Sequence, residues 1–381
     1  MSTNLFNNIF DRIVDEENIY QAYKKALEGD SKYNPEAMKF MMDEVYNLDK
    51  LRQSLIDGTY EFDGYIRLIV FEPKKRIVDA PHFKDKIVQL AINNVLKKIY
   101  NKTFIYDSYA CIDGKGTHKC AKRIQRFIRK AKWEYGEDAY IFKGDFKKFF
   151  YSIVRNILKR LLPKKVKCKR TLNLLFKIID SADSIDLLGL PLGNTLSQIC
   201  ANIYLNKLDN FCKRKLSLKY YTRYMDDFFI IVENKETAIE ILNVVTKFIE
   251  GRLKLKLNEN KTKIFPINQG VNAIGYKIYA THMLLRNDSK KKIKRKIRAM
   301  PHLILEGRLP IEKAEQMLNS WKGHAEHGDS HNFVQSLLKR FNFLYLVKKK
   351  NGKTAFKINV AKLKKEGDEH AVLQKREVAC M

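Results

Sequence analysis

Two adjacent carboxylates, Asp226 and Asp227, interrupt a stretch of aromatic and β-branched residues at 220–232. The stretch lacks a helical polar face and predicts a β-hairpin with the acidic pair at its bend. A third carboxylate, Asp145, ends a second apolar stretch that begins at Tyr140. Alone, the acidic pair would also suit a solvated turn, because Asp is a common turn residue. If the two strands are neighbours in one sheet, all three carboxylates meet.

A cluster of this kind predicts a metal site. Neighbouring carboxylates repel each other and raise their own pKa values unless a positive charge neutralises them. Magnesium prefers oxygen ligands from a few carboxylates together with substrate phosphates. Two such ions stabilise the attacking and leaving oxygens of an in-line phosphoryl displacement. We therefore expect two Mg²⁺ ions, with Mn²⁺ as the alternative, and a phosphoryl-transfer reaction.

The charge of the chain predicts a polyanionic partner. Lys and Arg number 73 against 43 Asp and Glu, which gives a net charge of +30. The positive charge is concentrated in segments, and residues 154–170 carry eight Lys or Arg and no acid. We expect that segment to follow a phosphate backbone, with binding that is sensitive to salt and indifferent to base sequence.

The remaining composition predicts a packed protein with no membrane partner. The chain has 381 residues, of which 45% are hydrophobic, enough for two or three subdomains. Apolar residues at spacings of three and four predict helices over residues 1 to about 60. The six cysteines lack zinc-site or redox spacing, and neither an export signal nor an apolar run of about 18 residues is present. These features predict a cytoplasmic location with reduced thiols.

Three blocks of the sequence stand in the order found in prokaryotic reverse transcriptases. They are the strand that ends at Asp145, Leu-Pro-Leu-Gly-Asn-Thr-Leu-Ser-Gln at 190–198, and Tyr-Met-Asp-Asp at 224–227. Over roughly residues 60–345 the chain resembles this family, which is related to group II intron and retron polymerases. The resemblance implies an α+β fold of the right-hand polymerase type, in which an antiparallel palm sheet packs on helices.

The resemblance also implies a division into domains. The expected parts are an N-terminal helical extension (1–60), fingers (61–139), a palm (140–280) with a fingers insertion at about 151–187, a helical thumb (281–347) and a basic, peripheral tail (348–381).

The family's catalytic roles carry over onto matching positions. Asp145 and Asp226 would hold the metals, with the backbone carbonyl of Phe146 as a further ligand, and Asp227 would assist in placing them. Lys261 would protonate the departing pyrophosphate, with Lys263 as the alternative. Phe150 would collide with a 2′-hydroxyl and so select deoxynucleotides. The alternative interpretation is that Phe150 only packs in the hydrophobic core.

Two further blocks would bind the incoming nucleotide. A strand at 65–72 that turns back through a basic tip resembles the fingers hairpin, in which Lys74 and Arg76 would hold the triphosphate, with Lys75 as the alternative to Lys74. Leu192, Gly193 and Gln198 would lie under the nascent base pair.

Leu192 and Gln198 depart from the family's usual Gln and Pro. The departure resembles the diversity-generating retroelement branch, whose polymerases misincorporate opposite adenine. An aliphatic side chain in place of a hydrogen-bonding one predicts a looser grip on the templating base.

Two basic segments would contact nucleic acid. Residues 107–118, with Gly114, Lys115 and Gly116, resemble a loop that lies against the template. Lys291, Lys294 and Arg295 would open the thumb helix over the template–primer duplex. The stretch 273–279 resembles the primer-grip hairpin.

The resemblance therefore predicts an RNA-directed DNA polymerase that uses deoxynucleoside triphosphates, an RNA template and a DNA or RNA primer. The expected setting is the error-prone polymerase of a diversity-generating retroelement, with a small basic accessory protein. A defence-associated, antiviral enzyme that works with a cognate non-coding RNA is the first alternative. A non-catalytic RNA-binding protein of the same fold is the second, and the three intact aspartates argue against it.

Overall fold

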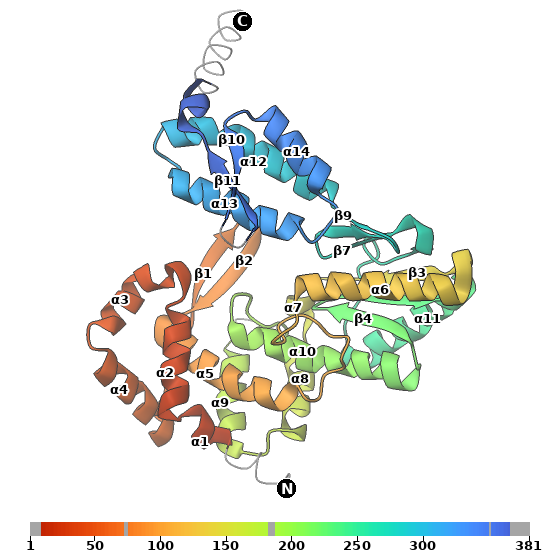
Figure 1. Cartoon of the computed structure of the whole chain (residues 1–381). Coiled ribbons are helices and arrows are strands. Elements are labelled where there is room, and N and C mark those ends of the chain that lie inside the picture. The colour runs from red at the N-terminus through yellow and green to blue at the C-terminus, as the bar shows by residue number, and fades with distance from the viewer. Residues whose placement is uncertain (1–8, 72–74, 182–186, 350–351, 366–381) are drawn as a thin grey trace, which may run out of the picture. The chain divides into compact units, whose positions relative to one another are not determined.

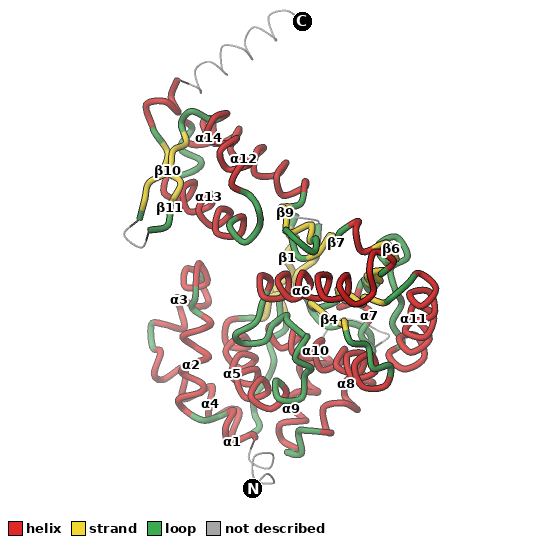
Figure 2. Tube along the Cα trace, turned by 45° about the vertical axis from the view of Figure 1, so that its right-hand side comes forward, coloured by secondary structure: helices red, strands yellow, loops and turns green. Residues whose placement is uncertain are grey.

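The computed structural model describes residues 9–71, 75–181, 187–349 and 352–365. They form two compact units, Met1–Cys120 with Tyr140–Phe265, and Ala121–Ala139 with Pro266–Met381 (Figure 1). Helices dominate both units, and the strands form small sheets (Figure 2). Helix α6 (Thr117–Tyr135) begins in the first unit and continues into the second. No helix among these described ranges is long and apolar enough to cross a membrane.

The first unit opens with the helices predicted for residues 1–60. They are α1 (Ile9–Ile13), α2 (Glu16–Ala26), the 3-10 helix η1 (Gly29–Tyr33), α3 (Pro35–Met41) and α4 (Glu44–Asp57). Side chains cap two of them, because Asp15 accepts from Asn18 N at 3.2 Å and Asn34 accepts from Glu36 N at 2.8 Å. Each cap satisfies a backbone donor that the first turn leaves free.

A two-stranded hairpin and a long helix follow. Strands β1 (Tyr65–Val70) and β2 (Arg76–Pro81) pair antiparallel, with Val70 opposite Arg76, which confirms the predicted hairpin. Helix α5 (Phe83–Tyr100) is buried along most of its length and packs against α2 and α10 (Thr195–Asn210). This helix ties the N-terminal helices to the rest of the first unit.

A four-stranded sheet of order β4-β5-β3-β6 organises the site. Its strands are β3 (Tyr140–Gly144), β4 (Tyr220–Tyr224), β5 (Asp227–Val232) and β6 (Lys263–Pro266). Helix α11 (Lys235–Phe248) packs against β3 and β5, and the π-helices η4 (Phe211–Lys215) and η5 (Ile249–Leu253) extend α10 and α11. Strand β5 is antiparallel to both β3 and β4, so the two acid-bearing segments are neighbours, as predicted.

The basic segment at 154–170 differs from its prediction. It spans α8 (Arg155–Leu161), the 3-10 helix η3 (Leu162–Lys164) and the start of α9 (Lys169–Asp180), after the short helix α7 (Phe149–Ser152). Arg155 is buried, and its guanidinium donates to the carbonyls of Leu188 and Gly189, each at 2.9 Å. The prediction of eight surface charges is therefore wrong for Arg155, because that side chain satisfies loop carbonyls inside the protein.

The second unit combines small strands with a helical core. Its elements are η2 (Gly136–Asp138), η6 (Ile267–Gln269), β7 (Val271–Ala273), β8 (Tyr276–Ile278), β9 (Met283–Leu285), α12 (Asn287–Leu305), α13 (Ile311–Ala325), α14 (His331–Arg340), β10 (Leu344–Lys348) and β11 (Thr354–Ile358). The hairpin predicted at 273–279 is present as β7–β8.

The predicted peripheral tail is wrong for residues 354–363. Strand β11 pairs with β10, and Phe356 and Leu363 are fully buried in the core that also holds Ile297 and Leu318. The apolar side chains of this short strand complete the helical core, which a basic composition alone does not indicate.

Candidate active site

The β4–β5 hairpin has a two-residue turn. Tyr224 pairs with Asp227, which leaves Met225 and Asp226 as the turn residues. Met225 has φ of 53°, in the left-handed region that side chains other than glycine rarely adopt. The acidic pair therefore lies where the sequence predicted, with Asp226 in the turn and Asp227 at the first position of β5.

The strand register brings Asp145 to the same place. Gly144 pairs with Phe228, so Asp145 follows β3 beside the hairpin turn. A Cβ atom on Gly144 would overlap the Phe228 ring, and only glycine allows this close approach of the two strands. Asp145 is 5% exposed.

The three carboxylates act on one another electrostatically. The pKa of Asp227 is raised to about 6, chiefly by burial; Asp226 and Asp145 contribute to the increase, while Lys143 opposes it. Burial also raises the pKa of Asp226, with a smaller contribution from Asp145, and Lys261 and Arg76 lower it. Asp226 and Asp227 thus both lie in a poorly solvated setting close to other carboxylates, which disfavours their charged forms.

Lys261 places a positive charge beside the carboxylates. Its Nζ donates to both carboxylate oxygens of Asp145, each at 2.9 Å. The segment that precedes Lys261 is held against Asp145. Asn258 N donates to the Asp145 carbonyl at 2.8 Å, and Leu257 forms an isolated antiparallel β-bridge with Phe146. The sequence predicted Lys261 as a proton donor to pyrophosphate, and the structure adds its contact with Asp145.

The donor set fits a divalent cation. Asp227 Oδ1 is buried and accepts no hydrogen bond from the described residues, and Lys143 Nζ is 3.8 Å away. A buried carboxylate oxygen without a donor is a ready ligand for a hard cation. Among residues 9–71, 75–181, 187–349 and 352–365, no three His, Cys, Asp or Glu side chains lie close enough together to hold an ion without rearrangement. Lys261 engages both oxygens of Asp145, and a bound ion would have to displace it.

The residues predicted to bind the nucleotide have mixed placements. Arg76 is exposed at the start of β2 and is one of the positive charges that lower the pKa of Asp226. Lys74 lies outside the described residues. Phe146 is buried, with its ring centroid 5.5 Å from that of Phe149, whereas Phe150 is partly buried, with its ring centroid 5.3 Å from that of Phe149.

The segment 190–198 contacts the β1–β2 hairpin and leads into α10. The Leu192 carbonyl accepts from Asp79 N at 2.7 Å, and Asn194 caps α10 by accepting from Leu196 N at 2.7 Å. Gly193 has φ of 103°, and a Cβ there would lie 2.6 Å from Val78 Cγ1. Gln198 is exposed on the first turns of α10 and accepts from Cys111 Sγ at 3.2 Å.

Residues 72–278 match the reverse transcriptase (RNA-dependent DNA polymerase) family, which is more than half of the chain. The chain belongs to the reverse transcriptase family. This confirms the predicted α+β right-hand polymerase fold and the enzyme class, RNA-directed DNA polymerase. Enzymes of this family use divalent metal ions, in agreement with the donor set formed by the aspartates.

The relatives are of the group II intron type. Protein YkfC of Escherichia coli (strain K12) is 26% identical over 284 residues, which cover 64% of this chain and 72% of YkfC. The group II intron-encoded protein LtrA of Lactococcus lactis subsp. cremoris is 26% identical over 302 residues, 61% of this chain and 49% of LtrA. The chain therefore spans about half of LtrA. Telomerase from Candida albicans, solved with a fragment of telomeric RNA, is 13% identical with a TM-score of 0.43, covering 77% of this chain and 60% of that one.

In this reverse transcriptase, the predicted template loop is held by its own lysine. Lys115 Nζ donates to the carbonyls of Tyr106 and Ser108 and lies 5.3 Å from the centre of the Tyr109 ring. Gly114 and Gly116 have φ of 70° and 138°. Part of the positive charge that suggested a phosphate contact therefore stabilises the loop itself.

The predicted thumb residues lie on α12. Lys291 and Arg295 are exposed, whereas Lys294 Nζ lies 5.2 Å from the centre of the Phe333 ring. The hairpin β7–β8 packs on α13, with the Tyr276 ring stacked 4.6 Å from that of His324. The Tyr276 hydroxyl also lies 3.0 Å from His324 Nδ1, so His324 contributes to the packing of this hairpin.

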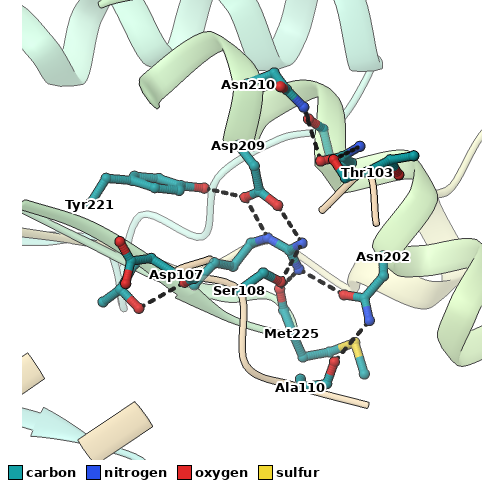
Figure 3. A network of polar contacts seen from close by, with 12 residues as sticks. Thr103, Asp107, Ser108, Ala110, Asn202, Asp209, Asn210, Tyr221 and Met225 are labelled. Atoms are coloured by element: carbon teal, nitrogen blue, oxygen red, sulfur yellow. Dashed lines mark hydrogen bonds and ion pairs between the residues drawn. The ribbon is translucent and has the colours of Figure 1, made fainter. Parts of the chain in front are cut away.

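Sequence reasoning missed a buried polar network behind the β4–β5 turn (Figure 3). Arg223 on β4 and Asp209 on α10 are both 0% exposed and form an ion pair. Tyr221, Asn202 and Ser108 complete the network. The available signal was a cation inside a strand of otherwise uncharged residues, since a fully buried arginine is rare unless it is paired.

Proposed function

We propose that this reverse transcriptase makes cDNA on an RNA template by two-metal nucleotidyl transfer at Asp145, Asp226 and Asp227. The observation that carries the proposal is the register of β3 and β5, which brings Asp145 beside the turn that holds Asp226 and Asp227, where Asp227 Oδ1 is buried and accepts no hydrogen bond from the described residues. Two Mg²⁺ ions, or Mn²⁺, would polarise the primer 3′-hydroxyl and stabilise the leaving pyrophosphate.

In this proposal the chain's own residues hold and deliver the reacting groups. Asp145 and Asp226 provide the principal carboxylate ligands, the Phe146 carbonyl adds another, and Asp227 completes the negative site. Without an ion the ammonium of Lys261 lies 2.9 Å from Asp145 Oδ1, and an ion bound to Asp145 would displace it while leaving its proton close to the reaction centre. Transfer of that proton from Nζ to the departing pyrophosphate would neutralise the leaving group.

Residues near the three aspartates would bind the incoming nucleotide. Arg76, whose charge reaches Asp226, and Lys74 would hold the triphosphate of a deoxynucleotide. Phe150, partly buried beside Phe149, would exclude a 2′-hydroxyl.

Template and primer would meet two further surfaces. The loop with Gly114, Lys115 and Gly116 would meet the template, and Lys291, Lys294 and Arg295 would meet the duplex backbone.

The direct test is primer extension on a defined RNA template with Mg²⁺ and either deoxynucleotides or ribonucleotides. We expect extension with deoxynucleotides that is lost in the Asp226→Ala, Asp227→Ala double variant. Failure on RNA and DNA templates alike, with the protein folded and bound to RNA, would support the non-catalytic RNA-binding alternative.

For the biological role we propose an error-prone polymerase of a diversity-generating retroelement, acting in the cytoplasm with a small basic accessory protein. The supporting observation is that Leu192, an aliphatic residue, lies in the turn that contacts the β1–β2 hairpin, while Gln198 lies on the first turns of α10 that follow it. Errors concentrated opposite template adenine, reduced by Leu192→Gln, are the expected result. An accurate or repetitive product would favour a defence enzyme working with a non-coding RNA.

A further inference from the structure

The network behind the turn makes the backbone of Met225 part of a rigid assembly. Arg223 forms a two-pronged pair with Asp209, with Nε to Oδ1 and Nη2 to Oδ2 each at 2.7 Å (Figure 3). The same guanidinium reaches three other groups. Its Nη1 donates to the Met225 carbonyl at 2.8 Å and to Asn202 Oδ1 at 3.1 Å, and its Nη2 donates to Ser108 Oγ at 3.2 Å.

The Met225 carbonyl is the decisive acceptor. Its peptide unit includes the N–H of Asp226, so it joins the two residues of the turn. Rotation of this peptide plane would therefore break the Arg223 bond and turn the backbone from which the Asp226 side chain projects. Met225 also has φ of 53°, which an L side chain adopts only when its surroundings hold it there.

We propose that Arg223, oriented by Asp209, is a positioning residue that fixes the Met225–Asp226 peptide plane and so aims the Asp226 carboxylate into the active site. This inference rests on the proposed function only in assigning Asp226 to the site.

The network also links the turn to the loop before α6. Arg223 N donates to the Asp107 carbonyl at 2.9 Å, and Tyr109 N donates to the Arg223 carbonyl at 3.1 Å. Asn202, which accepts from Arg223, donates its own Nδ2 to the Ala110 carbonyl at 2.9 Å. The predicted template loop and the catalytic turn are thus held by the same side chains, so the Arg223 network sets their relative position.

A purely stabilising role accounts poorly for this arrangement. Replacing a buried ion pair by apolar residues of similar volume often leaves stability unchanged or raised, because desolvation offsets the attraction of the charges. The planar guanidinium, with its five donors, fixes direction as well as charge. Three acceptors in addition to its own carboxylate partner would not be needed for packing alone.

The test replaces the pair without leaving a buried charge. In the Arg223→Met, Asp209→Leu double variant we expect a folded protein that binds template–primer with unchanged affinity. Its kcat should fall about 100-fold, since small displacements of reacting groups cost about that much. Mn²⁺ affinity, followed by electron paramagnetic resonance without nucleotide, should weaken by about 10-fold, as for other residues that orient metal ligands.

Asp209→Asn is the second variant, in case the double replacement does not fold. It keeps the shape and one acceptor but loses the charge that orients Arg223, and we expect a smaller loss in kcat and in Mn²⁺ affinity. Tyr60→Phe is the matched control, because it removes a buried hydrogen bond to Asp85 in the N-terminal part of the first unit. It should lower the melting temperature while leaving kcat per folded molecule unchanged.

Normal kcat and Mn²⁺ affinity in the folded Arg223 and Asp209 variants would overturn the inference, as would losses no greater than the unfolded fraction explains. Failure of the proposed function looks different. In that case the wild-type protein does not extend a primer, and the Mn²⁺ titration still compares the variants.

Discussion

The two hairpins of the first unit, β4–β5 and β1–β2, are built in opposite ways. Phe228, Ile230 and Val232 of β5 are buried, and the strand is paired on both sides. Strands β1 and β2 form a sheet of two strands, and Ile69 and Phe71 are 52% and 70% exposed. A lone two-stranded sheet with exposed apolar side chains gains little stability from packing. The carboxylates therefore lie on a preorganised base, whereas we expect the β1–β2 hairpin, which we propose binds the nucleotide, to gain its contacts when substrate arrives.

The largest expected contrast concerns stability. Ile230→Ala on β5 should lower the free energy of unfolding by about 3 kcal/mol, because it leaves a cavity in a close-packed core. Ile69→Ala on β1 should change it by less than about 0.5 kcal/mol, as expected for an exposed position. Urea denaturation of both variants measures the difference. Equal losses would show that β1 is packed as firmly as β5.

The close approach of β3 and β5 gives the next effect. Gly144→Ala introduces a methyl group into the Phe228 ring and should cost about 2 kcal/mol by overpacking. It should also reduce primer extension, because Asp145 is the next residue. Gly251→Ala is the matched control, since a Cβ there meets nothing within 4 Å. Chemical denaturation and single-turnover extension follow both variants, and similar behaviour of the two would contradict the described strand register.

A smaller effect concerns pH. The pKa of Asp227 is raised to about 6 in the folded protein, above its unfolded value, so folding disfavours the ionised carboxylate. This penalty, of order 2 kcal/mol, is present above pH 6 and disappears as the pH falls toward 4. Without metal, the wild-type protein should gain stability between pH 8 and pH 5 relative to Asp227→Asn. Denaturation in EDTA at several pH values measures this difference, and parallel curves would refute it.

Metal should reverse that preference. A divalent ion binds the ionised carboxylates, so Mg²⁺ should stabilise the wild-type protein more at pH 8 than at pH 5.5. Asp227→Asn should show a weaker dependence. No comparable effect is expected from substitutions in the β1–β2 hairpin.

The contrast between the hairpins also separates what the sequence could predict from what it could not. The aromatic and β-branched residues and the interrupting acids were enough to predict the β4–β5 turn and its neighbour β3. Lys261 is 116 residues from Asp145, and a local sequence pattern cannot predict a contact across that separation. Eight basic residues at 154–170 resembled one surface, but the pattern could not show that Arg155 turns inward to loop carbonyls. Arg223 was hidden for the same reason, because its partner Asp209 belongs to another element.

The most direct test of the whole account is single-turnover incorporation of one deoxynucleotide on an RNA template by Asp145→Asn. We expect a rate at least about 1,000-fold below wild type, because a metal-ligating, charge-stabilising group is lost. Template–primer affinity should be unchanged, and Asp138→Asn, at an exposed carboxylate of η2, should be as fast as wild type. Incorporation by Asp145→Asn at a rate close to wild type would contradict the central claim that these three aspartates form the polymerase site.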